Sequence, residues 1–216
     1  SCRSSCAEGG SAVAKRLYRL FPALYPAPAL LVTSTSPDGS FNVMTASWAG
    51  MVSSAPPQVA VALRPYRLSC QTIRRTGEFV INCPTEELLL AVDRCGMLSG
   101  RAVDKLQATG LTPEPAQHVK APLIRECPVS LECRVAHSLH LDSHELFVGV
   151  VLAVQVDEAI LTADGQIDYD RVRAIAVLGN EYRRIGERLH TAGFSLSEDG
   201  PATPAHPQEA SHGPLR

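Results

Sequence analysis

Residues 42–50 form the first of four short segments whose residue types could hold a small ligand. Small and hydroxyl side chains there end a β-type run and precede Trp48 and Gly50. Backbone N–H groups beside an aromatic wall suit a flat heteroaromatic ring, whose heteroatoms they would bind while Trp48 limits access. The competing interpretation is a strand that enters a loop, with Trp48 as an ordinary core residue.

Residues 64–72 form the second segment, at the start of a short expected helix. Ser69 and Thr72 are three residues apart, and Arg64 and Arg67 lie just upstream. Free N–H groups and the positive end of the helix dipole favour phosphate at such a position. In the simpler interpretation Ser69 is only an N-cap and the arginines are solvated.

Two further segments carry a cation or a histidine. In residues 96–105, Lys105 follows a glycine-flanked loop and could reach an anion, or it is a surface lysine that begins a helix. In residues 142–149, His144 opens a strand after a tight turn. It could meet a nucleotide phosphate or a metal, although a lone strand histidine is usually structural.

Composition and missing motifs exclude several function classes. The 216 residues are 45% hydrophobic and 19% charged, which permits a sizeable core. The net charge of −2 does not indicate electrostatic binding to nucleic acid or to a membrane surface. A Rossmann glycine motif and a Gly-x-Ser-x-Gly motif are both missing. Seven cysteines without a CxxC pair indicate reduced thiols in a cytoplasmic protein. A strand would split His137 from His140 and His144, so no metal site is expected.

The elements that must position these segments are mainly β. Turn residues 36–39 divide residues 29–48 into a hairpin, and residues 129–141 and 144–156 form a second one. The other expected elements are strands at 59–63 and 78–83, helices at 69–76, 85–95 and 104–109, a loop at 96–100, a small hairpin or loop at 160–169 and an apolar run at 173–178. Six or seven strands and two or three short helices predict a small antiparallel β-barrel with helices outside it.

The domain division follows the composition. Residues 1–13 are expected to be a flexible leader, residues 14–194 the folded domain and residues 195–216 a disordered-type tail rich in Pro and Gly.

Taken in order, the four segments resemble the flavin reductase-like family with the FMN-binding split-barrel fold, and most of all its flavoredoxin branch. The stretches that carry the resemblance are YPAPALLVTSTSPDGSFNVMTASWAG, PPQVAVALRPYRLSCQTIRRTGEFVIN, CGMLSGRAVDKLQATGLT, PVSLECRVAHSLHLDSHELFVGVVLAV and EYRRIGERL. Together they cover about residues 25–190.

The resemblance implies a homodimer whose subunit interface helps to form each FMN site. It implies that the isoalloxazine ring is lined by Thr45, Ala46, Ser47 and Trp48. It implies that the ribityl-phosphate end is held by Arg64, Ser69, Cys70 and Thr72, with Asn82, Ser99, Gly100 and Lys105 as further candidates. The related reductases carry a Gly-Asp-His turn linked with nicotinamide binding; here only His144 of that turn is retained, and Val150 replaces a common Glu.

These features predict an NAD(P)H-dependent flavin reductase in which hydride passes from nicotinamide to flavin N5 and no side chain acts as an acid or base. One alternative is a non-enzymatic FMN electron carrier of flavoredoxin type that works with a redox protein partner. Another is a split-barrel protein that binds haem or stores flavin.

Overall fold

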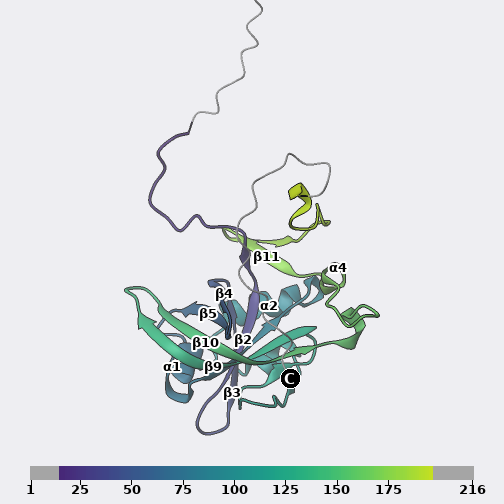
Figure 1. Cartoon of the computed structure of the whole chain (residues 1–216). Coiled ribbons are helices and arrows are strands. Elements are labelled where there is room, and N and C mark those ends of the chain that lie inside the picture. The colour runs from purple at the N-terminus through teal and green to yellow at the C-terminus, as the bar shows by residue number, and fades with distance from the viewer. Residues whose placement is uncertain (1–14, 197–216) are drawn as a thin grey trace, which may run out of the picture.

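The computed structural model describes residues 15–196, and its centre is a seven-stranded antiparallel sheet of order β3-β2-β6-β9-β10-β5-β4 (Figure 1). The strands of this sheet are β2 (Leu30–Thr35), β3 (Phe41–Ala46), β4 (Ala49–Ser54), β5 (Pro57–Leu63), β6 (Glu78–Cys83), β9 (Val129–His140) and β10 (Glu145–Val156). The predicted mainly β, antiparallel architecture is therefore confirmed.

Smaller elements surround this sheet. A three-stranded sheet is formed by β1 (Ala27–Pro28), β11 (Ile175–Leu178) and β12 (Glu181–Arg184), and a two-stranded one by β7 (Pro113–Glu114) and β8 (Leu123–Ile124). The helices are α1 (Leu68–Thr76), α2 (Leu89–Met97), α3 (Lys105–Thr109) and α4 (Tyr169–Val172), with 3₁₀ turns η1 (Glu86–Leu88), η2 (Glu158–Ile160) and η3 (Phe194–Leu196). Within residues 15–196, no helix has the length and apolar character needed to cross a bilayer.

The connection between the two edge strands shows how the sheet curls into a split barrel. Strands β3 and β4 lie at opposite edges of the sheet, but only Ser47 and Trp48 separate them in the chain. Three peptide steps span at most about 11 Å, so the two edges must approach each other at this end. The Trp48 carbonyl accepts a hydrogen bond from the Ala62 N–H of β5 at 2.8 Å, which fixes the connection to the β4 side.

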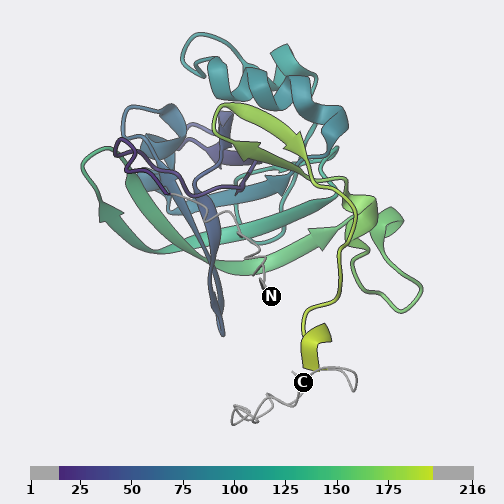
Figure 2. The same ribbon diagram turned by 90° about the horizontal axis from the view of Figure 1, so that it is seen from above.

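Alternate residues of β2 face two different cores, as the period of a strand requires. Val32 packs with Phe79 and Phe147 inside the barrel. Leu31 points the other way and packs in a second cluster with Val92 of α2. In Figure 2, α2 lies outside the barrel beside the β11–β12 pair, and residues of β11 and β12 join this second cluster.

Helix α1 ends at Thr76 because a glycine follows it. Gly77 takes a left-handed backbone with φ 70°, and its N–H donates to the Ile73 carbonyl at 2.8 Å. Glycine adopts this conformation without the steric cost that a Cβ imposes. The chain can therefore turn at once into β6, which pairs with β2 and β9.

Three predicted details were wrong or incomplete. Strand β4 was missed because it is paired through its backbone to β5 while most of its side chains are exposed, so no burial pattern marks it. The first residues of the predicted loop 96–100 belong to α2. Residues 160–169, predicted as a small hairpin or loop, form a loop with one isolated bridge, and η2 and α4 at its two ends were not predicted. The predicted leader 1–13 lies outside the described residues, as does the predicted tail beyond Leu196.

Candidate functional site

Two adjoining cavities lie where the two sheet edges meet the start of α1. We call the first the Trp48 cavity; it has a volume of about 240 Å³ and is lined by Met44, Thr45, Ala46, Ser47, Trp48, Ala62, Leu63, Arg64, Arg67 and His144. We call the second the Lys105 cavity; it has a volume of about 150 Å³ and is lined by Asn42, Met44, Tyr66, Arg67, Leu68, Ser69, Leu98, Ser99, Gly100, Arg101 and Lys105. Because Met44 and Arg67 line both, the two cavities are neighbours.

An aromatic stack forms one wall of the Trp48 cavity. The rings of Trp48 and His144 are 4.3 Å apart between centroids and 29° from parallel. The Ser143 hydroxyl and His144 Nδ1 are 2.8 Å apart, which fixes the imidazole plane. Burial lowers the pKa of His144, and the positive charge of Arg64 lowers it further, so the ring is neutral at neutral pH.

The opposite wall of the Trp48 cavity is the end of β3. Met44 and Ala46 pack into the barrel core, whereas Thr45 points outward, and its hydroxyl donates to the Val92 carbonyl of α2. Strand β3 pairs with β2 alone among the described strands, so one edge of its backbone has no strand partner. This wall therefore offers backbone groups rather than reactive side chains.

The Lys105 cavity is built around the first turn of α1. The first N–H groups of a helix have no partner within it, and the helix dipole makes this end positive. The Ser69 hydroxyl accepts a 2.7 Å hydrogen bond from the buried amide of Asn42. Lys105 is 5% exposed, its Nζ donates to the Cys95 carbonyl at 2.7 Å, and burial lowers its pKa.

The loop between α2 and α3 completes this cavity and depends on a glycine. A Cβ on Gly100 would lie 2.1 Å from Oδ1 of Asn42 and 3.2 Å from Cδ2 of Leu68, so any other residue would force a shift. Arg101 ties the loop to the α1 region: its guanidinium donates to the Tyr66 carbonyl at 3.0 Å and to the Gln71 side chain at 2.6 Å.

The structure brings most of the predicted site residues together. Thr45, Ala46, Ser47, Trp48, Arg64 and His144 line the Trp48 cavity, and Ser69, Ser99, Gly100 and Lys105 line the Lys105 cavity. Thr72 lies instead against a separate hollow of about 280 Å³ beside Arg74 and Arg75. The Ser69–Thr72 spacing does not place both residues at the ligand, because only the first turn of α1 reaches the Lys105 cavity.

Cys70 and Asn82 also lie away from both cavities. Burial raises the pKa of the Cys70 thiol to about 11, and its Sγ faces Glu145 Oε2 at 3.6 Å. The Asn82 amide donates to the Leu31 carbonyl at 3.1 Å and accepts from the Ile124 N–H at 2.9 Å and the Ser130 hydroxyl at 2.8 Å. These bonds give Asn82 a structural role in joining strands, and they argue against its prediction as a ligand residue.

Among the cavity residues that the predicted set omitted, three have an amide or guanidinium side chain. Asn42 lies two residues before Met44 on β3, so both side chains point to the same face of the sheet. Strand alternation could have indicated this placement. Arg67 immediately precedes α1 and borders both cavities. Arg101 holds the loop described above, and its partners lie about 30 residues away in the chain, so no local sequence signal identifies it.

A larger cavity, of about 820 Å³, lies elsewhere, between η1, α4 and the segment after β12. Two of the three arginines that line it, Arg173 and Arg184, pair with Glu86, and Arg173 also pairs with Glu87. These two carboxylates balance the charge of the two arginines, and we assign no ligand chemistry to this cavity. In the part of the chain described, no group of His, Cys, Asp and Glu side chains could hold a metal ion.

Comparison with known proteins gives consistent matches. A family model described as the flavin reductase like domain matches residues 23–186. An uncharacterized protein of Archaeoglobus fulgidus is 38% identical over 146 residues, which are 68% of this chain and 81% of the relative. Flavoredoxin of Desulfovibrio vulgaris (Miyazaki F) superposes with a TM-score of 0.80 at 34% identity, covering 85% of this chain and 100% of that one. An FMN-binding protein from Thermus thermophilus superposes with a TM-score of 0.69 at 25% identity, covering 82% of this chain and 99% of that one.

Proposed function

Because this chain belongs to the flavin reductase-like family, we propose that it binds FMN across the two adjoining cavities and reduces that flavin with NADH or NADPH. The observation that carries the proposal is that two cavities with different linings adjoin each other. One combines cations with a helix N-terminus, and the other combines an aromatic wall with an open strand edge. A ligand with an anionic end and a flat heteroaromatic end matches both.

The Lys105 cavity fits the phosphate end of FMN. Lys105 and Arg67 supply positive charge, Ser69 and Ser99 supply hydroxyl groups, and the first turn of α1 supplies N–H donors. Gly100 leaves the backbone of its loop free to approach a ligand closely, since no Cβ stands in the way. The hydrogen-bond donors and cations of this cavity suit a single phosphate group, which favours FMN over FAD.

The Trp48 cavity fits the ring of FMN. When bound, the flavin supplies a two-electron acceptor, which this chain's side chains do not provide. The backbone N–H groups near Thr45 and Ser47 would orient the polar edge of the ring and stabilise charge there. Trp48 limits water, and neutral His144 adds no charge to the wall. No proton transfer by a side chain is needed for hydride transfer, so we assign no catalytic acid or base.

A second copy of the chain would cover the open side of this site. Trp48 is 45% exposed, and apolar side chains nearby on β4, Met51 and Val52, are more than half exposed. Residues 15–26 leave the barrel as an extended segment with Leu17 and Leu20 fully exposed (Figure 1). We propose a homodimer that buries these surfaces. Sedimentation should give a dimer; a monomer that still binds FMN tightly would contradict it.

Two measurements test the function. Mass analysis of the flavin released from purified protein should give FMN, and recovery of mostly FAD would contradict the assignment. Anaerobic stopped-flow should show fast reduction of bound FMN by NADH or NADPH, slowed in His144→Ala if the histidine contacts nicotinamide. Fast reduction that the substitution leaves unchanged would keep the reductase and discard that role of His144.

The alternative function is an FMN electron carrier, which the similarity to flavoredoxins favours. A carrier would be reduced slowly by both nicotinamides but rapidly by a reduced protein donor or dithionite. A haem-binding protein would instead show a Soret band and no flavin. The absorbance spectrum and the stopped-flow traces together separate these three functions.

A further inference from the structure

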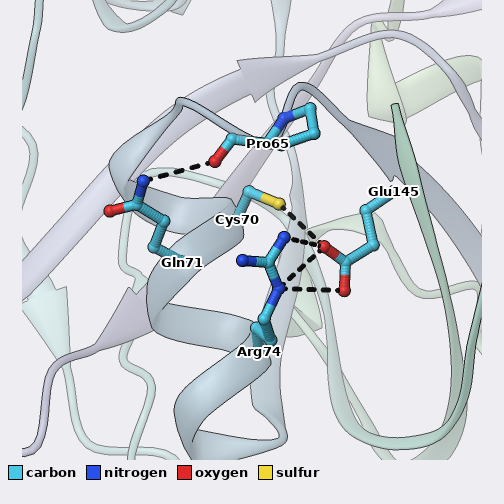
Figure 3. Close-up of polar contacts among 5 residues, drawn as sticks. All are labelled: Pro65, Cys70, Gln71, Arg74 and Glu145. Carbon is cyan, nitrogen blue, oxygen red and sulfur yellow. Dashed lines mark hydrogen bonds and ion pairs between the residues drawn. The ribbon is translucent and has the colours of Figure 1, made fainter. Parts of the chain in front are cut away.

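The buried carboxylate of Glu145, at the start of β10, is paired with Arg74 of α1 (Figure 3). The Nε atom of Arg74 donates to Glu145 Oε2 at 2.9 Å and to Oε1 at 3.3 Å, and its Nη2 contacts Oε2 as well. The Cys70 thiol approaches the same oxygen at 3.6 Å. The Glu145 side chain is 7% exposed, whereas that of Arg74 is 48% exposed.

The ion pair touches neither cavity, yet it lies one residue from the aromatic stack. Glu145 is the first residue of β10 and directly follows His144. The Glu145 side chain reaches Arg74 of α1, whereas the His144 ring stacks on Trp48. The helix that holds Glu145 is also the helix whose first turn forms the Lys105 cavity.

The start of β10 is the terminal position of the two ladders that it shares with β5 and β9. The turn before it is closed by one hydrogen bond, from the Leu141 N–H to the His144 carbonyl at 2.8 Å. Glu145 stands opposite Leu63 on β5 and His140 on β9, at the first register positions of both ladders. Strand ends fray unless side chains fasten them, and here Glu145 is the residue fastened to the helix layer.

We propose that Arg74 and Glu145 are positioning residues that set the place of His144, and of Trp48 stacked on it, at the mouth of the Trp48 cavity. The functional meaning of this inference rests on the proposed function, because the cavity is the one assigned to the flavin ring. Its test does not, because the stack can be observed in flavin-free protein.

The chain supplies its own probe, since Trp48 is its single tryptophan. Arg74→Gln removes the cation from Glu145 while keeping a polar side chain. Arg75→Gln, on the same helix, is the matched control. In flavin-free protein diluted to the monomer, the acrylamide quenching constant of Trp48 emission should rise by up to about twofold in Arg74→Gln, because 45% of the residue is already exposed in the single chain. Arg75→Gln should match the unmodified protein.

A pH titration of the same emission provides a readout that stability alone would not move. Protonated imidazole quenches a stacked indole, so the emission follows the ionisation of His144. In Arg74→Gln its midpoint should shift upward, toward the ordinary histidine value, as the ring becomes solvated. Arg64, whose charge lowers the His144 pKa, and Arg67, which lines the same cavity, are unchanged in both variants.

A conservative variant keeps the test decisive. Arg74→Lys retains the charge but loses the two-pronged contact, so it should shift both readouts in the same direction by a smaller amount. It also carries the test if Arg74→Gln does not fold. Adding Glu145→Gln to Arg74→Gln should cause no further shift, because both changes remove one interaction.

Folded Arg74→Gln or Arg74→Lys with the quenching constant and pH midpoint of Arg75→Gln would overturn the proposal and leave the pair a purely structural contact. Failure of the proposed function would look different. In that case the flavin-free readouts would shift as expected, but no variant and no unmodified protein would bind FMN.

Discussion

Replacing Gly100 by alanine should damage the Lys105 cavity far more than the fold. The added Cβ would lie 2.1 Å from Oδ1 and 2.9 Å from Cγ of Asn42, closer than real Cβ contacts come. Either Asn42 must release its 2.7 Å hydrogen bond to Ser69 or the loop must move outward. Losing a buried hydrogen bond costs about 1–3 kcal/mol, and overpacking costs about the same.

The loop can relieve the contact because its neighbours Ser99 and Arg101 are exposed. Outward movement protects the core but separates Ser99 from Ser69 and Lys105, so the cost should appear in ligand binding. Since about 1.4 kcal/mol corresponds to a tenfold change, we expect FMN to bind about ten- to a hundredfold more weakly. The free energy of unfolding should fall by less than about 2 kcal/mol.

Titration of flavin-free protein with FMN, followed by quenching of flavin fluorescence, measures the affinity, and urea unfolding measures the stability. Gly186→Ala is the matched control, because a Cβ there meets no atom within 4 Å and its backbone is not left-handed. The control should change neither quantity. If Gly100→Ala bound FMN as tightly as the control, the phosphate end would not lie in the Lys105 cavity.

Three further outcomes follow from the contacts described above. Ser69→Ala should weaken FMN binding by about tenfold or more in the same titration, since a hydrogen bond to a charged group contributes about 1.5–3 kcal/mol, whereas Thr72→Ala should have a smaller effect. Asn82→Ala should lower the free energy of unfolding by about 2–4 kcal/mol in urea, through lost buried hydrogen bonds, without a matching loss of FMN affinity. Hydrogen bonds from Arg74 hold the pKa of Glu145 below its ordinary 4.5 despite burial, so this stabilisation is present above pH 4.5 and is lost as the pH falls through the lowered pKa. Acid unfolding of Glu145→Gln should therefore show a shallower loss of stability below about pH 5, and an unchanged slope would contradict the pairing.

The sequence indicated those features whose causes are local. Gly77 and the β-branched run after it marked both the end of α1 and the whole of β6, which the structure places at the predicted residues 78–83. Trp48 was placed at the site by residue type and by its position at the end of a strand. Such signals need only the chain within a few residues, so propensity and pattern can detect them.

The features that escaped prediction depend on contacts between distant segments. Gly100 and Asn42 are 58 positions apart, and their close approach exists only after α2 packs on β3. Asn82 resembles a ligand residue in type, but its amide is fully used in joining β2, β8 and β9. Arg74 and Glu145 are joined across 71 positions, and neither has a local motif.

The two-residue connection Ser47–Trp48 joins two edge strands, and a ligand bound beside it would stabilise the sheet at this edge. Among the strands in residues 15–196, each of the two that it joins has a neighbour on one side only, so the hydrogen-bond ladder of the barrel is interrupted between β3 and β4. A bound heterocycle whose polar edge faces the unpaired edge of β3 would supply hydrogen bonds that a neighbouring strand would otherwise make. Amide hydrogen exchange at Ala46 and Ser47 should then slow when FMN binds, while exchange at Ile81, in the closed part of the sheet, should be unaffected. The cofactor would then stabilise the edge of the barrel in addition to being bound there.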